Sequence, residues 1–183
     1  MGRDKALLPW RGETFLGAAI DAFRMSTELV IVVAGKNVDN VRPIADARGV
    51  FTVINPAPER GQFSSLQVGL QEVLNRGRDA AMITLVDRPI VLFTTITYMW
   101  KAFLDAIARR KWAVVPEYGG RHGHPIIVGR EMITAFLRAD SSSTAREVEH
   151  ANQSRIEYVP VEDPLAVENV DTPDDYARVI TKE

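Results

Sequence analysis

Hydrophobic and polar residues alternate in blocks that indicate helices and strands in turn. Between residues 14 and 25, apolar residues recur at helical spacing, which predicts a helix that packs by one face. Residues 29–34 form a short apolar run rich in β-branched residues, typical of a strand buried on both faces of a parallel sheet. The further predicted helices are 38–47, 64–75, 94–110, 130–137, 143–150 and 173–181, and the further predicted strands are 50–54, 80–86, 112–116, 125–128 and 156–161.

Strands separated by helices predict an α/β fold with three layers: a mostly parallel, Rossmann-like sheet with helices on both faces. A length of 183 residues fits one domain, and no repeat or linker divides the chain. With 46% apolar and 25% charged residues, the composition excludes a disordered or fibrous protein. No apolar run approaches the roughly 20 residues of a membrane-spanning helix, and we expect a cytoplasmic protein.

Charge and cysteine content exclude several functions. The 22 basic and 24 acidic residues give a net charge of −2, so neither nucleic acid nor a membrane is expected as a partner. The absence of cysteine removes thiolate metal sites, iron–sulfur clusters and cysteine nucleophiles. The chain also lacks the G-x-S-x-G, G-x-x-x-x-G-K-[ST] and H-E-x-x-H motifs, which leaves serine hydrolases, P-loop NTPases and zincins without support.

Carboxylates near two predicted element ends are candidate metal ligands. Asp87 directly follows the predicted strand 80–86, at the sheet edge where open α/β folds bind ligands. Mg²⁺ takes oxygen ligands at such places, although an Asp that caps a turn is the alternative. Asn169 and Asp171, which precede the predicted helix 173–181, are further candidate oxygen ligands.

A polar segment follows the strand 50–54. Asn55 is followed by Gly61, and Ser64 and Ser65 open the next predicted helix. Free amides and hydroxyls at a helix start suit an anion or the polar edge of a base, and a plain serine N-cap is the alternative.

A second polar segment, residues 119–125, has the sequence GGRHGHP. Its glycines allow close backbone approach to a ligand, and Arg121 could contact an anionic substrate. His122 and His124 form a His-x-His pair, which is a weak zinc signal without a third ligand. A hairpin loop with solvated histidines is the alternative.

The order of these segments is more specific than any one of them. They are residues 1–9 (MGRDKALLP), 55–56 (NP) with 61 and 64–66 (SSL), 87–89 (DRP), 120–125 (GRHGHP) and 169–175 (NVDTPDD). This series resembles the MobA-like nucleotidyltransferases over essentially the whole chain, and it looks most like the molybdenum cofactor cytidylyltransferase branch. The resemblance implies one domain over residues 1–183, with a Rossmann-like fold of the nucleotide-diphospho-sugar transferase type.

The same resemblance implies an activity. It is the Mg²⁺-dependent transfer of CMP from CTP to a molybdopterin-type cofactor with release of pyrophosphate, and a client molybdoenzyme is an implied partner. By resemblance, Lys5 contacts the nucleotide phosphates, and Asp87 holds Mg²⁺ together with a ligand from the segment of Asn169 and Asp171. The remaining implied roles are nucleotide binding by Asn55, Ser64 and Ser65, and substrate binding by Arg121, Gly123, His124 and Pro125.

The chain departs from the family pattern at three places. Arg88 stands where Gln is common, and His122 where Arg is common. The family also begins with a strand and a glycine-rich loop before the Met-Gly, so relative to the family this chain is N-terminally truncated, and we expect an upstream reading frame to encode them. That loop carries the signal for base preference. The alternatives are therefore a transferase that uses GTP or another acceptor, or a non-catalytic cofactor-binding protein for molybdoenzyme maturation.

Overall fold

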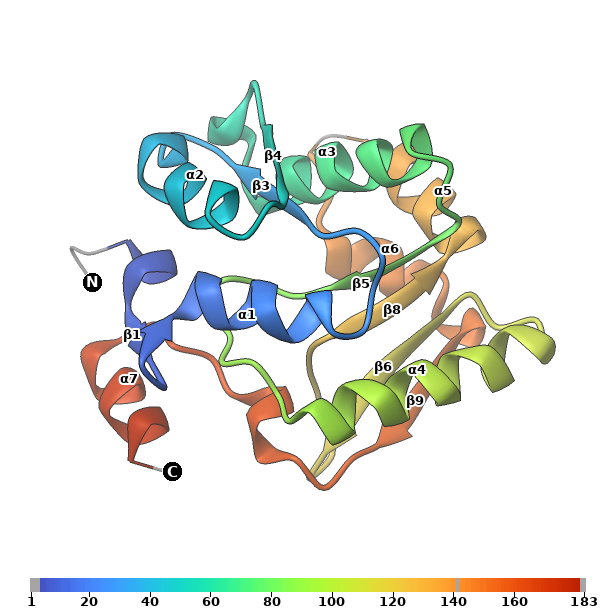
Figure 1. The fold of residues 1–183 in the computed structure, drawn as a ribbon. Helices are drawn as coiled ribbons and strands as arrows, with labels where there is room; N and C mark the ends of the chain where they lie inside the picture. The colour runs from blue at the N-terminus through green and yellow to red at the C-terminus, as the bar shows by residue number, and fades with distance from the viewer. Residues whose placement is uncertain (1–3, 141, 182–183) are drawn as a thin grey trace.

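The structure, a computed structural model, describes residues 4–140 and 142–181 (Figure 1). Residues 1–3 of the N-terminal motif lie outside the described residues. The helices are α1 (Phe15–Arg24), α2 (Val38–Asp46), α3 (Gln62–Asn75), α4 (Phe93–Ala108), α5 (Arg130–Arg138), α6 (Ala145–Ala151) and α7 (Pro173–Ile180). The strands are β1 (Pro9–Trp10), β2 (Glu13–Thr14), β3 (Ile31–Ala34), β4 (Phe51–Ile54), β5 (Ala80–Ile83), β6 (Ala113–Tyr118), β7 (Arg121–His122), β8 (Ile126–Gly129) and β9 (Ile156–Pro160). Short 3₁₀ helices are η1 (Lys5–Leu7), η2 (Pro58–Arg60), η3 (Gln153–Arg155) and η4 (Pro164–Val167).

The strands of the α/β core fall into two groups. β3 and β4 pair in parallel, and a larger sheet has the order β5-β8-β6-β7 with β9 parallel to β6. β8 runs antiparallel to both β5 and β6, which makes the larger sheet mixed. β1 and β2 form a separate small hairpin near the N-terminus.

Helices cover both faces of the strands, which confirms the three predicted layers (Figure 1). On one face α1 and α2 pack on β3, and α4 packs on β6, β8 and β9. On the other face α3, α5 and α6 pack on β5, β6, β8 and β9. Within the described ranges, no helix is both long and apolar enough to cross a bilayer.

The predicted elements are found with shifted ends. α3 begins at Gln62, two residues before the predicted start, because Gly61 is its N-cap with a φ of +88°. Ser64 and Ser65 therefore lie in the first turn of α3, and the serine N-cap weighed from the sequence does not occur. α2 runs through Pro43, although proline removes one helical hydrogen bond.

The strand 29–34, expected to be buried on both faces, is only partly buried, and so is β5. In β3, Val32 and Ala34 are buried, whereas Ile31 and Val33 are half-buried. All four residues of β5 are half-buried. A cleft of 1740 Å³ lies between these strands, and it is lined by residues of both. The prediction was wrong in this respect because apolar composition does not show whether each strand edge has a neighbour.

Candidate active site

Lys5 joins two carboxylates that lie far apart in the sequence. Its Nζ donates to Asp171 Oδ1 at 2.7 Å and lies 3.5 Å from Asp87 Oδ2. Asn169 Nδ2 donates to the other oxygen of Asp171. The structure thus brings together four residues that were singled out in the sequence. Asp87 does not directly follow the strand as predicted, since β5 ends at Ile83 and Asp87 lies four residues further on.

Local hydrogen bonds fix the backbone around Lys5. Asp4 caps η1, because its Oδ1 accepts from the Ala6 amide at 3.1 Å. Its Oδ2 accepts from Asn37 Nδ2 at 2.9 Å, which ties η1 to the end of β3. Sequence reasoning missed Asn37, since no local pattern indicates a contact across 33 residues.

The two carboxylates of this cluster stabilise the positive charge of Lys5. Partial burial lowers the pKa of Lys5, but the hydrogen bond to Asp171 and the negative charge of Asp87 and Asp171 outweigh it, so the pKa is raised. Lys5 is therefore a cation at neutral pH, placed between the carboxylates of Asp87 and Asp171.

The donor set also fits a divalent metal ion. Asp87 Oδ1 is buried and has no hydrogen-bond partner, which leaves one carboxylate oxygen available as a ligand. Among the described residues, no three His, Cys, Asp or Glu side chains form a metal cluster. Two carboxylates and an amide oxygen match an ion such as Mg²⁺, which completes its coordination with substrate phosphates and water.

The polar segment after β4 forms a compact hydrogen-bonded group. Asn55 Nδ2 donates to Ser64 Oγ at 2.8 Å and to Ser65 Oγ at 2.9 Å. Asn55 and Ser64 are buried, at 3% and 6% exposure. Neither can reach a ligand, and their role is to hold Ser65 in place. Ser65 is half-buried and lines the large cleft, which makes it the member that can reach a ligand.

The segment 119–125 packs against η4. The Gly123 amide donates to Pro116 at 2.9 Å, and a Cβ on Gly123 would lie 1.8 Å from the Ala166 carbonyl oxygen. The close backbone approach that Gly123 permits is thus to Ala166. Arg121 Nη2 donates to the Val167 carbonyl at 2.8 Å.

His124 is held neutral. Burial, together with the positive charge of Arg88, lowers its pKa to about 4. Its Nδ1 lies 3.4 Å from the Ile83 carbonyl oxygen, and its backbone amide donates to Ala166 at 2.8 Å. Pro125, which follows through a cis peptide bond, is buried.

Arg88 lies between the cluster of Lys5, Asp87 and Asp171 and the residues that line the large cleft. Its Nη1 donates to the Glu168 carbonyl at 3.2 Å, while its Nε is buried without a hydrogen-bond partner. Burial, with the nearby charge of Arg121, lowers the pKa of Arg88 against the opposing effect of Asp87. Sequence analysis noted Arg88 only as a departure from the family, and its position directly after Asp87 was the available signal.

The candidate residues do not form one contiguous group. Ser65, Arg121, Gly123 and His124 line the large cleft, and so does Arg88. The cluster of Lys5, Asp87 and Asp171 adjoins the cleft through Arg88, the neighbour of Asp87. The histidines do not act as a metal pair, since His122 instead stacks on Tyr158 with ring centroids 3.9 Å apart.

Solved structures share this fold along the chain. The crystal structure of Rv0371c from Mycobacterium tuberculosis has a TM-score of 0.82 at 27% identity, covering 99% of this chain and 90% of that one. A complex of Rv0371c with manganese has a TM-score of 0.79 at 25% identity, covering 98% and 92%. A nucleotidyl transferase from Methanothermobacter has a TM-score of 0.77 at 21% identity, covering 97% and 84%.

The chain is a nucleotidyltransferase, because a family model of that class matches most of it, and a solved nucleotidyl transferase shares its fold. Residues 1–156 match the MobA-like NTP transferase domain, and the chain belongs to that family. It is also similar to the molybdenum cofactor cytidylyltransferase of Escherichia coli, with 22% identity over 181 residues, covering 96% of this chain and 86% of that protein. The resemblance stated from the sequence motifs is confirmed.

Proposed function

We propose that this nucleotidyltransferase moves CMP from CTP to the terminal phosphate of a molybdopterin-type cofactor, with Mg²⁺ as its metal. The observation that carries the proposal is the contact of Lys5 with both Asp171 and Asp87, in the loop that follows β5. The reaction brings several phosphate charges together, and a cation beside two carboxylates that can hold a metal ion suits the stabilisation of those charges. The similarity to a molybdenum cofactor cytidylyltransferase supports the choice of substrates.

The reaction needs no protein nucleophile. An oxygen of the acceptor phosphate forms a bond to the α-phosphorus of CTP, and the bond from that phosphorus to the bridging oxygen of pyrophosphate breaks. CMP ends on the acceptor and pyrophosphate leaves. Asp87 and Asp171, with Asn169 beside them, would hold Mg²⁺, which would supply neutralisation of phosphate charge and alignment of the reacting groups. Lys5 adds a second positive charge and holds the triphosphate in place.

The two sides of the cleft divide the substrates between them. The amide group of Asn55 donates to the hydroxyls of both Ser64 and Ser65. We assign the Ser65 hydroxyl to the binding of the cytosine base. We assign acceptor binding to Arg121, Gly123 and His124, which line the cleft, and to Pro125, which is buried next to them in the chain. The neutral imidazole of His124 can donate or accept a hydrogen bond without adding charge, which suits recognition of a pterin edge.

The proposal also implies a partner protein and a cellular location. A molybdopterin product must reach an apoenzyme, so a client molybdoenzyme is the expected partner, and the cytoplasm is the expected location. The 183 residues carry a net charge of −2, which gives no electrostatic reason for nucleic acid or anionic lipid to compete.

The test is a thermal-shift screen with Mg²⁺ and CTP, GTP or ATP, followed by a pyrophosphate-release assay with a molybdopterin acceptor. Ligand that binds the folded state raises Tm by mass action. We expect stabilisation by CTP that depends on Mg²⁺ and is lost in Asp87→Asn, and pyrophosphate release that requires the acceptor. Stabilisation by GTP alone would assign the other base, and a folded chain that ignores all three nucleotides would overturn the proposal.

A further inference from the structure

Arg88 and Arg121 come from distant parts of the chain and are anchored on one short turn. Arg88, in the loop after β5, donates from Nη1 to the Glu168 carbonyl at 3.2 Å. Arg121, in β7, donates from Nη2 to the Val167 carbonyl at 2.8 Å. Val167 ends η4 and Glu168 is its C-cap, so two consecutive carbonyl oxygens hold the two guanidinium groups. Both side chains line the cleft.

No carboxylate in direct contact balances the positive charge of this arginine pair. In the part of the chain that the structure describes, neither Arg88 nor Arg121 forms an ion pair, and the Glu168 carboxylate contacts Arg178 at 3.7 Å. Burial lowers the pKa of Arg88, and repulsion by Arg121 acts in the same direction, against the attraction of Asp87. Arg88 remains a cation, as arginine does in proteins. An anion bound between the two side chains would relieve their repulsion.

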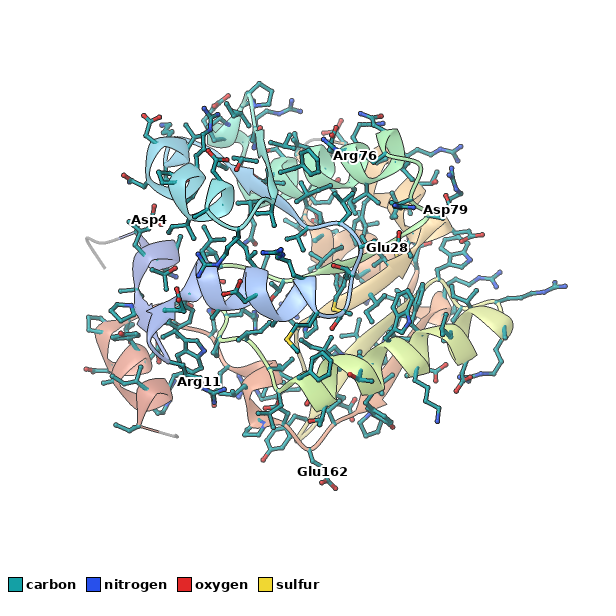
Figure 2. All side chains as sticks on the ribbon, viewed as in Figure 1. Asp4, Arg11, Glu28, Arg76, Asp79 and Glu162 are labelled. Atoms are coloured by element: carbon teal, nitrogen blue, oxygen red, sulfur yellow. The ribbon has the colours of Figure 1, made fainter. Side chains whose placement is uncertain are left out.

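Arginines on the outer surface of the molecule have carboxylate partners instead. Arg76 lies 2.7 Å from Glu72, and Arg130 contacts Asp79. Arg76 and Asp79 are both labelled in Figure 2, at the edge of the molecule and away from Lys5. The arginine pair thus differs from these surface contacts both in its place at the cleft and in its uncharged protein partners.

Both arginines keep hydrogen-bond donors for a ligand. Arg88 Nη2 makes no hydrogen bond within the described chain and is not buried, so it is open to the cleft. Arg121 is an exposed residue, and its Nη2 alone is bonded. Guanidinium groups bind phosphate oxygens through paired N–H donors. Two of them side by side suit a phosphate group with two negative charges.

The arginine pair adjoins the cluster that we assign to the metal ion and the triphosphate. Arg88 directly follows Asp87, and the charges of Asp87 and Asp171 both act on it. Lys5 contacts the same two carboxylates. The site therefore has two separate groups of cations, Lys5 on one side of the carboxylates and the arginine pair on the other.

We propose that Arg88 and Arg121 together bind the phosphate group of the acceptor as a dianionic monoester and direct it toward the nucleotide. This role rests on the proposed transfer reaction and adds Arg88 and a requirement for a monoester to it. A phosphate monoester has three terminal oxygens, so two can accept hydrogen bonds from the arginines while the third forms the bond to the α-phosphorus. The two cations also offset the repulsion between the acceptor phosphate and the triphosphate.

Binding of phenyl phosphate to the full chain, in EDTA and without nucleotide, tests the arginine pair. At about pH 8, where a phosphate monoester is a dianion, we expect binding that calorimetry detects, and much weaker binding of methyl phenyl phosphate, the diester. Arg88→Gln and Arg121→Gln should each weaken the binding of phenyl phosphate at least about tenfold, because each removes one charge. Arg42→Gln, at an exposed position of α2 outside the cleft, is the control and should bind normally.

The position of the bound phosphate can be observed separately. The charge of Arg88 acts on His124, so the imidazole NMR signals of His124 should move as phenyl phosphate is added, while those of His150 in α6 stay in place. Lys5→Ala should weaken the binding less than either arginine variant does. Equal binding by both arginine variants and the unchanged chain would overturn the proposal, as would binding that only Lys5→Ala removes.

Kinetics and nucleotide binding separate this role from the proposed function. Arg88→Gln should raise KM for the acceptor at least about tenfold and leave KM for CTP unchanged, which a general loss of structure would not do. Urea midpoints check folding, and Arg121→Gln, at an exposed position, provides an independent variant. Normal CTP binding with phosphate binding unaffected by either variant would overturn the arginine pair alone. Phosphate binding that needs both arginines, in a chain that does not bind CTP, would overturn the proposed function alone.

Discussion

The backbone amide of Val170 donates to the carbonyl oxygen of Asp87 at 2.9 Å. Val170 is fully buried, so the bond is shielded from water and fixes the segment before α7 against the exit of β5. Asp171, the next residue, is thereby brought to Lys5. The position of one candidate metal ligand thus depends on the backbone of the other.

Removal of either charged partner at this cluster should abolish most activity. We expect Lys5→Ala and Asp87→Ala each to lower turnover by about 100-fold or more, the effect of losing one major transition-state contact. Pyrophosphate release under saturating nucleotide measures it. Lys101→Ala, which removes an exposed lysine of α4, is the matched control and should retain activity. A Lys5→Ala enzyme with most of its turnover would remove Lys5 from the proposed mechanism.

A methyl group at Gly123 should destabilise the fold. The added Cβ would lie 1.8 Å from the Ala166 carbonyl oxygen and 2.5 Å from its carbon, so the backbone must move. We expect Gly123→Ala to lose about 3 kcal/mol of unfolding free energy in urea. Gly119→Ala is the comparison, because Gly119 has a φ of +57° but open space around it, and only left-handed strain of about 1 kcal/mol is expected. Equal losses would show that the contact with Ala166 is easily relaxed.

Asn55 should contribute to stability through the polar group that it organises. Asn55→Ala removes the donor to Ser64 and Ser65 and the acceptor for the Ala57 amide. Because these groups are buried or half-buried, we expect a loss of about 2 kcal/mol. Asn75→Ala, at an exposed position at the end of α3, should change stability by less than about 0.5 kcal/mol. Urea midpoints compare the two, and similar values would contradict the prediction.

Stability should fall in acid partly because of His124. Its pKa is lowered from 6.5 to about 4 in the folded state, so between these values the unfolded chain binds a proton that the folded chain does not. The contribution is fully present above pH 6.5 and is lost as the pH falls toward 4, by about 3 kcal/mol. His124→Gln should therefore flatten the dependence of unfolding free energy on pH in this window. An unchanged slope would contradict the burial of a neutral imidazole.

Arg88 should influence the same titration. Its positive charge contributes, after burial, to the low pKa of His124. Arg88→Gln removes that charge, and we expect the His124 pKa to move upward, toward 6.5. An NMR titration of the imidazole measures the shift directly. A pKa unchanged in the variant would leave burial as the only cause.

Hydrophobic patterning alone predicted much of the fold. The spacing in residues 94–110 corresponds to α4, and the apolar runs correspond to β3, β5 and β9. The pairing of strands was less accessible. β7 lies inside a segment predicted as a loop, because its hairpin depends on Gly119 and Gly120, both with positive φ.

Position along the chain indicated Asp87, Asn169 and Asp171 as candidate oxygen ligands, but motif order alone indicated Lys5. No local pattern relates Lys5 to Asp171, and Lys5 would be an ordinary surface charge in isolation. The resemblance joined them, and the structure places them 2.7 Å apart. The contacts of Asn37 with Asp4 and of Arg88 with the Glu168 carbonyl could not be predicted, because no sequence pattern indicates either hydrogen bond.

The bond between Lys5 and Asp171 closes a loop of 166 residues, and α7 lies beside β1 in Figure 1, where Tyr176 donates to the Pro9 carbonyl at 2.7 Å. Contacts of such sequence separation form late, because the intervening chain must be ordered first. During translation Lys5 leaves the ribosome long before Asp171 is made. The cluster of Lys5, Asp87 and Asp171 therefore cannot assemble until the segment before α7 has emerged, however early β3 and β5 have folded.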